Sequence, residues 1–284
     1  MQAALAAITL AASIVNGAIG YGFSSITVPL ALLFLSNRVL NPALVPIEIG
    51  VNAYVLWMNR AAARTVVRRV LPIVGGLAPG VAAGTLIVSS VDAGWVKLAT
   101  FAVLLPLILL QAAGFRRRLR AERTAGVALG GGVGMLYAVT TVSGPPLALM
   151  LNNQGLANAE FRAGMAVIRL AEGTMTAAAY AVAGLYTRES LLLIPVIVPG
   201  VLLGVPIGAW LIRRVEAEAF GRVCMSFDAV LVAIGIAVLL PALDVTGPAA
   251  GFALVGLVIA VNIALLYGFF SSPRPAAQPP DVTR

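Results

Sequence analysis

Apolar segments recur along almost the whole chain, and short stretches between them carry most of the charged residues. Many of the segments reach about 20 residues, the length that an α-helix needs to cross a membrane. The pattern therefore predicts an all-α fold, a polytopic membrane helical bundle. Its predicted segments are 3–35, 43–60, 70–90, 93–113, 125–154, 160–184, 190–212, 217–241 and 249–270.

Two of these segments, 3–35 and 125–154, are interrupted by glycine and proline. Residues of the first interruption reappear 117 positions later in the second, where Gly17, Pro29, Leu30 and Asn41 become Gly134, Pro146, Leu147 and Asn158. Hydrocarbon cannot hydrogen-bond to an open backbone, so such breaks persist only where protein or a wet cavity covers them. Interrupted segments at matching places in two halves are typical of a transporter's binding site.

The recurring breaks divide the chain into two predicted transmembrane repeats, 1–113 and 125–241. A basic cytoplasmic loop at 114–124 is predicted to join them, a transmembrane helix at 242–270 to close the chain, and a proline-rich tail at 271–284 to be disordered. Small residues such as Gly80 with Gly84 and Gly200 with Gly204 are compatible with either internal helix packing or a homodimer interface.

Composition excludes a soluble domain, because 60% of the residues are hydrophobic, 11% are charged and the mean hydropathy is +0.99. A single cysteine, Cys224, excludes an intrachain disulfide, and the lack of histidine excludes imidazole proton relays and histidine metal ligands. We therefore predict no metal and no cofactor. The net charge of +8 lies mainly between segments, which indicates membrane topology rather than nucleic-acid binding.

The arginines favour a particular path through the membrane. Arginine clusters at 60–69 and 116–123 are separated by two spans, so both are predicted to be loops that face the cytoplasm. Arg213 and Arg214 join that side only if segment 125–154 enters and returns on one face, although Arg188 then lies outside. This re-entrant interpretation gives each half three crossings and an inverted topology, a common transporter plan.

Polar residues collect at the two interruptions, where free backbone N–H groups and helix N-termini favour anions. The alternative is that the glycines permit close packing and the hydroxyls cap their own helices. We predict that the substrate-binding residues are Asn16, Gly20, Tyr21, Gly22, Ser24, Ser25, Asn52, Tyr137, Thr140, Thr141, Ser143, Gly144 and Arg169.

Charged residues inside apolar segments are costly and usually functional. Arg169 either contacts an anionic substrate, with Glu172 holding it, or forms an internal pair with Glu172 three residues on. The 117-residue spacing places Asn52 opposite Arg169, so both could serve one cavity. Glu48 is either an interfacial residue or a proton acceptor for coupled transport, and Asp228 is predicted to hydrogen-bond to a neighbouring helix.

The glycine clusters that precede a Pro-Leu pair resemble those of the sulfite exporter TauE/SafE family, also called the 4-toluene sulfonate uptake permease family. They comprise Gly17, Gly20 and Gly22 before Pro29-Leu30, and Gly134 and Gly144 before Pro145-Pro146-Leu147. The first copy departs from the family's usual consecutive glycines, and the second carries Ser143 beside its glycine. The resemblance implies movement of sulfite, sulfonates such as sulfoacetate, or related anions across a bacterial inner membrane.

The sequence predicts a secondary transporter, and specifically an exporter, that moves a small sulfur-containing anion by alternating access. Its predicted partners are the anion and the lipid bilayer, with a homodimer left open and nucleic acid excluded. An anion channel with the same site and a transporter of a different small organic anion are the alternatives. An enzyme is disfavoured because histidine and a metal-ligand cluster are lacking, and no phosphate-binding GxxxxGK[ST] motif indicates ATP use.

Overall fold

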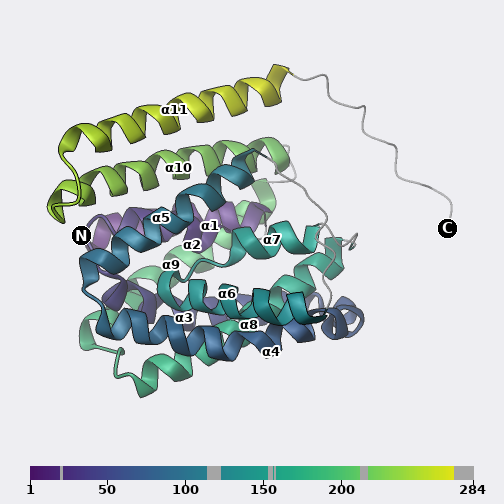
Figure 1. Cartoon of the computed structure of the whole chain (residues 1–284). Coiled ribbons are helices and arrows are strands. Elements are labelled where there is room, and N and C mark those ends of the chain that lie inside the picture. Colours follow the sequence, from purple (N-terminus) through teal and green to yellow (C-terminus); the bar gives the residue numbers. More distant parts are fainter. Residues whose placement is uncertain (20–21, 114–122, 153–155, 157, 212–216, 272–284) are drawn as a thin grey trace.

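The computed structural model describes residues 1–19, 22–113, 123–152, 156, 158–211 and 217–271, and these ranges are almost entirely helical (Figure 1). The all-helical prediction is confirmed. Most of the expected loop at 114–124 and nearly all of the expected tail at 271–284 lie outside the described residues. The described helices are α1 (Gln2–Ile19), α2 (Phe23–Ala31), α3 (Asn37–Met58), α4 (Arg60–Ser90), α5 (Ala93–Ala112), α6 (Arg123–Thr140), α7 (Gly144–Asn152), α8 (Asn158–Val182), α9 (Arg188–Leu211), α10 (Ala217–Ala242) and α11 (Pro248–Ser271).

Both interrupted segments consist of a longer helix followed by a short one. α1 and α6 have 18 residues each, and α2 and α7 have 9 residues each. Three long helices follow each short helix, and α11 comes last. The sequence breaks therefore correspond to real interruptions of the helical backbone.

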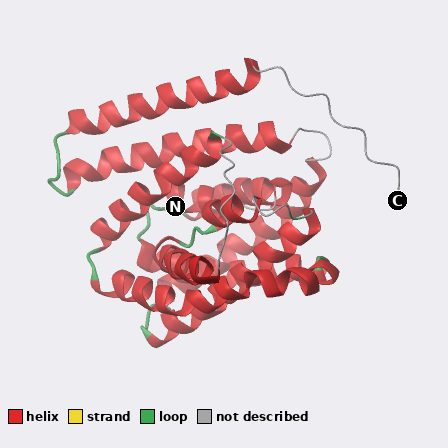
Figure 2. Cartoon of the chain, turned by 45° about the vertical axis from the view of Figure 1, so that its right-hand side comes forward, coloured by secondary structure: helices red, strands yellow, loops and turns green. Residues whose placement is uncertain are grey.

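Six of the described helices are long and apolar enough to cross a membrane, namely α3, α4, α5, α9, α10 and α11. Helix α8 is 25 residues long but is not among the six, and it is the helix that carries Arg169 and Glu172. In both views α11 lies beside α10 at the edge of the bundle (Figures 1 and 2). Large side chains on α11, such as Phe252 and Ile263, are exposed, as a lipid-facing helix requires.

The predicted loop at 60–69 is wrong. α3 ends at Met58, and α4 starts at Arg60 and continues for 31 residues, so these arginines lie in its first turns. Alanine and arginine are strong helix formers, so the helix extends well before the apolar pattern of α4 begins. Thr65 in this extension donates a hydrogen bond to Glu160 at the start of α8, 3.1 Å away, which attaches it to the second half of the chain.

Two helix pairs form the closest packing of the bundle, α4 with α6 and α1 with α9. A Cβ atom added to Gly80 would collide with the Gly131 backbone, and one added to Gly208 would collide with the Ile14 carbonyl. Gly84 and Gly204 lie equally close to the neighbouring helix. These small residues serve internal packing, so they are not available as a dimer interface.

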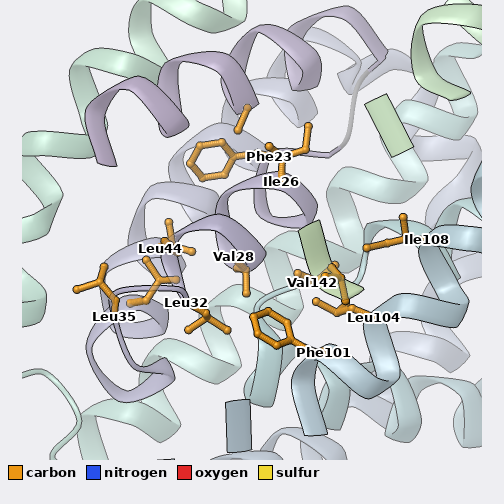
Figure 3. Close-up of a cluster of buried hydrophobic side chains, with 14 of the residues drawn as sticks. Phe23, Ile26, Val28, Leu32, Leu35, Leu44, Phe101, Leu104, Ile108 and Val142 are labelled. Carbon is orange, nitrogen blue, oxygen red and sulfur yellow. The ribbon is translucent and has the colours of Figure 1, made fainter. Parts of the chain in front are cut away.

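Helix α2 is enclosed by protein. Phe23, Ile26 and Val28 belong to a buried apolar cluster that Phe101 of α5 also joins (Figure 3). The turn before α2 contains Gly22 with φ of 105°, a conformation that glycine adopts without steric cost. Enclosure by protein is the condition under which a broken helix is stable at membrane depth.

The end of α6, just before the second break, is capped by side chains from other helices. Asn37 and Asn41 of α3 donate hydrogen bonds to the Val139 carbonyl, at 3.1 and 2.8 Å. The hydroxyl of Tyr180, on α8, donates to the Ala138 carbonyl. These carbonyls have no partner within α6 because the helix stops at Thr140, so the amides satisfy groups that hydrocarbon could not. Sequence reasoning recognised Asn41 only as a mark of the repeat.

Candidate functional site

The centre of the candidate site is Glu48, in the middle of α3. Its side chain is almost completely buried, and its carboxylate accepts three hydrogen bonds. Ser24 of α2 and Arg169 of α8 donate to Oε1, the latter from Nη2 at 3.0 Å as an ion pair. The hydroxyl of Tyr137 of α6 donates to Oε2 at 2.8 Å. Glu48 is therefore an internal residue that joins four helices, and the interfacial alternative is wrong.

A second buried carboxylate, Glu172 of α8, lies at the other break. The hydroxyl of Ser143, directly before α7, donates to its Oε2 at 2.6 Å. The Ser24–Glu48 bond thus lies within the first half of the chain, and the Ser143–Glu172 bond lies within the second. Among the hydrogen bonds of these two carboxylates in the described ranges, those from Tyr137 and Arg169 to Glu48 connect the two halves.

Several polar atoms of the buried α2 and α8 side chains have no hydrogen-bond partner among the residues that the structure describes. They are Nε of Arg169, Oε1 of Glu172, and the hydroxyls of Thr27 and Thr176. Arg169, Glu172 and Thr176 are spaced by three and four residues, so they lie on one face of α8. On this face, Nε of Arg169 and the Thr176 hydroxyl are unused donors, and Oε1 of Glu172 is an unused acceptor.

The structure brings together only part of the predicted site. Ser24, Tyr137, Ser143 and Arg169 converge on Glu48 or Glu172. Gly20 and Tyr21 lie outside the described residues. Asn16, Ser25 and Gly144 are buried but make no hydrogen bond to these charged residues in the part of the chain that the structure describes.

The two threonines before the second break behave as the local alternative predicted. Thr140 donates to the Leu136 carbonyl in its own helix at 2.7 Å and accepts from the Val142 N–H at 3.0 Å. Thr141 has φ of 54°, and its hydroxyl donates to the Thr140 carbonyl at 2.7 Å. These hydroxyls support the bend of the backbone and do not extend to the charged cluster.

The predicted pairing of Arg169 with Glu172 is corrected. The ion-pair partner of Arg169 is Glu48 in the other half, and Glu172 accepts a hydrogen bond from Ser143 instead. The amide of Asn52 donates to the Glu48 carbonyl in its own helix at 2.8 Å. Spacing along the sequence identified the positions but could not determine which face of α3 meets α8.

The predicted hydrogen bond of Asp228 to a neighbouring helix is wrong. The residue is fully buried in α10, and neither of its carboxylate oxygens has a hydrogen-bond partner in the described part of the chain. Its neighbours within one helix turn belong to the apolar cluster that also contains side chains of α2 and α5. These neighbours are Met225, Ala229 and Val232. Asp228 therefore lies among hydrocarbon side chains, apart from the charged cluster.

No cluster of three or more acidic, histidine or cysteine side chains that could hold a metal occurs in the described ranges. The side chains that meet at the two breaks are one guanidinium, two carboxylates and several hydroxyls.

Long apolar helices around a buried charged cluster define a multi-pass membrane protein of the transporter class. The family comparison makes this assignment specific, because the profile of the sulfite exporter TauE/SafE family matches residues 5–238. The chain belongs to this family, as its glycine and proline elements predicted, and it is a transporter and not an enzyme. Membership implies transport of sulfur-containing anions such as sulfite or sulfonates. No curated protein and no solved structure matches the chain.

Proposed function

We propose that this protein is a secondary transporter that exports a small sulfur-containing anion, such as sulfoacetate, another sulfonate or sulfite, across a bacterial inner membrane. The observation that carries the proposal is the convergence of both helix breaks on one buried cluster with a single guanidinium, Arg169. A membrane helix carries such a group at a considerable cost, which function justifies. A negative cytoplasmic potential contributes about 2.3 kcal/mol per charge per 100 mV toward the exit of an anion.

Arg169 would contact the oxyanion, since a guanidinium can donate two parallel hydrogen bonds to it. The N-terminal ends of α2 and α7, beside Ser24 and Ser143, would add the field of the helix dipole, which favours negative charge. Tyr137 would adjust the position of Glu48, to which it donates. An incoming anion would therefore compete with Glu48 for the guanidinium.

The directions of the helices support an inverted arrangement of the two halves. Helix α1 runs parallel to α9 and α6 runs parallel to α4, because their close contacts advance together along each pair. The contacts are Gly200 with Leu10 and then Gly208 with Ala18 in one pair, and Gly76 with Val127 and then Gly84 with Met135 in the other.

The start of α1 and the end of α6 then lie at the same end of the bundle. The start of α9 lies at this end, beside the start of α1. The end of α8, which precedes α9, lies there too, because Tyr180 near the end of α8 contacts Ala138 near the end of α6. α3 also begins at this end, since Asn41 contacts Val139. These contacts support a re-entrant path for the α1–α2 element and the rocking of one half against the other.

Binding to the purified protein tests the proposal. We expect sulfoacetate, sulfite or an aromatic sulfonate to raise the melting temperature, because a ligand that binds the folded state stabilises it as RT ln(1+[L]/Kd). Arg169→Lys keeps the charge but loses the planar fork, so it should weaken binding at least about tenfold. Arg60→Lys, at an exposed position on α4, is the matched control and should bind as the parent does.

Two results would count against the proposal. If none of these compounds binds, the substrate class is wrong, and if Arg169→Lys binds as tightly as the parent, Arg169 is not the anion contact. Counterflow in proteoliposomes then separates a transporter from a channel, because only a transporter exchanges labelled anion with saturable kinetics.

A further inference from the structure

With both of its carboxylates ionised, the buried cluster carries one excess negative charge before any anion arrives. It contains two carboxylates, Glu48 and Glu172, and one guanidinium, Arg169, and all three side chains are buried. An anion that enters a buried site of this composition adds a further negative charge without a cation to balance it. Burial of unbalanced charge is strongly unfavourable, so the binding of an anion requires a compensating change.

No additional cation from the surrounding helices faces the cluster within the described residues. The α4 side chains packed in the same cluster as α8 are Val66, Val70, Ile73 and Leu77, and none of them titrates. Helix α7 has no titratable residue, and α6 contributes only Tyr137 at this point. The charged groups that act on Glu172 are Arg169 and Glu48.

The two carboxylates are not equivalent in their hydrogen bonding. Glu48 accepts three hydrogen bonds, one of them from the guanidinium. Glu172 accepts one, from Ser143, and its Oε1 has no partner. Each hydrogen bond that a carboxylate accepts is weakened when the carboxylate takes up a proton, so the carboxylate with fewer donors and an unpartnered oxygen loses less. Glu172 is therefore the carboxylate that can accept a proton at the lower cost.

We infer that Glu172 binds a proton from solution together with each transported anion, and that this proton offsets the charge the anion brings. The inference rests on the proposed function and specifies how that site is coupled to pH. The proton adds to Oε1, leaving the bond from Ser143 to Oε2 in place. A dianion carried with one proton still moves one net negative charge, whereas a monoanion carried with one proton moves none.

The test is calorimetric titration of sulfoacetate into the purified full-length protein between pH 6 and pH 9. Sulfoacetate stays a dianion over this range, so any pH dependence belongs to the protein. One linked proton should weaken binding by up to about tenfold per pH unit as the pH rises. Titrations in two buffers of different ionisation enthalpy should also show uptake of close to one proton per anion at high pH.

The variants separate Glu172 from other buried carboxylates. Glu172→Gln is neutral at every pH, so it should bind sulfoacetate with the affinity of the parent at low pH and lose the pH dependence. Asp228→Asn is the matched control, since Asp228 is also fully buried but lies in the apolar α2–α5–α10 region. It should keep the pH dependence of the parent.

Each remaining outcome has a clear meaning. Binding to the parent without proton uptake refutes the coupling and leaves the proposed anion site intact. If the pH dependence of sulfoacetate binding persists in Glu172→Gln, or disappears in Asp228→Asn, the proton belongs to another residue and the inference is overturned. Absence of sulfoacetate, sulfite and sulfonate binding at every pH refutes the proposed function and the coupling together. The proton count is measured on the parent protein, so it tests the coupling itself even if a variant does not fold.

Discussion

The ion pair between Glu48 and Arg169 allows a quantitative test of the buried cluster. Nη2 of Arg169 and Oε1 of Glu48 lie 3.0 Å apart, which corresponds to a gross attraction of about 5 to 6 kcal/mol at an effective dielectric constant of about 20. Desolvation of both ions offsets much of this value, but removal of one partner from a buried pair costs about 3–5 kcal/mol. Because Glu172 lies three residues from Arg169, the two single replacements should not be equal.

Arg169→Met leaves two buried carboxylates and no cation, so it should lower the free energy of unfolding by about 3–5 kcal/mol. Glu48→Gln leaves Arg169 with Glu172 on the same face of α8, so its cost should be smaller, about 1–3 kcal/mol. The double variant removes one charge of each sign. It should be more stable than Arg169→Met alone, which means that the two changes are strongly non-additive.

The assay is unfolding of the purified protein by a denaturing detergent in mixed micelles, followed by tryptophan fluorescence. Arg60→Met, at an exposed position, is the control and should change stability by no more than about 0.5 kcal/mol. The reasoning is refuted if the two single effects simply add in the double variant, or if Arg169→Met is as stable as the parent.

Two further predictions concern glycines, each with a control on the same chain. Gly80→Ala places a Cβ 2.8 Å from the Met135 nitrogen, whereas Gly75→Ala on the same helix meets nothing within 4 Å. Both changes gain the same helix propensity, so the steric clash at Gly80 should make Gly80→Ala less stable than Gly75→Ala by about 1–3 kcal/mol in the same unfolding assay. Equal stabilities of the two variants would contradict the close packing of α4 against α6. Gly184 has φ of 67°, and a Cβ added there would meet nothing within 4 Å, so Gly184→Ala should lower the free energy of unfolding by about 1–2 kcal/mol through backbone strain alone. Gly247→Ala, also in open space but without a positive φ, should lower it much less. Equal losses in the two variants would rule out backbone strain as the cause.

Hydropathy located most of the helices within a few residues. Segment 93–113 became Ala93–Ala112, and segment 217–241 became Ala217–Ala242. The largest error was at the start of α4, which begins ten residues before its apolar segment. Membrane hydropathy detects only the part of a helix that avoids charge, so an arginine-rich extension of the same helix is read as a loop.

The charged residues of the buried cluster could be identified from the sequence, but their contacts could not. Arg169, Glu172 and Glu48 were identified because charge inside an apolar segment is costly. Their pairing depends on which face of α3 meets α8, and a single sequence does not contain that information. The same reasoning mistook Asp228 for a hydrogen-bonded residue, because burial in an apolar cluster and burial beside a donor look identical along one helix.

The hydrogen bonds of the cluster fall into two kinds, and the difference bears on how the proposed transporter would move. Ser24–Glu48 and Ser143–Glu172 each connect a break to a carboxylate in its own half, so rocking of the halves would preserve them. The contacts from Tyr137 and Arg169 to Glu48 connect the halves, so the same motion would have to break them. Breaking a buried ion pair is costly unless another anion takes the place of the carboxylate. A transported anion at Arg169 would supply that replacement, and the closed cluster would then open more easily with substrate than without it.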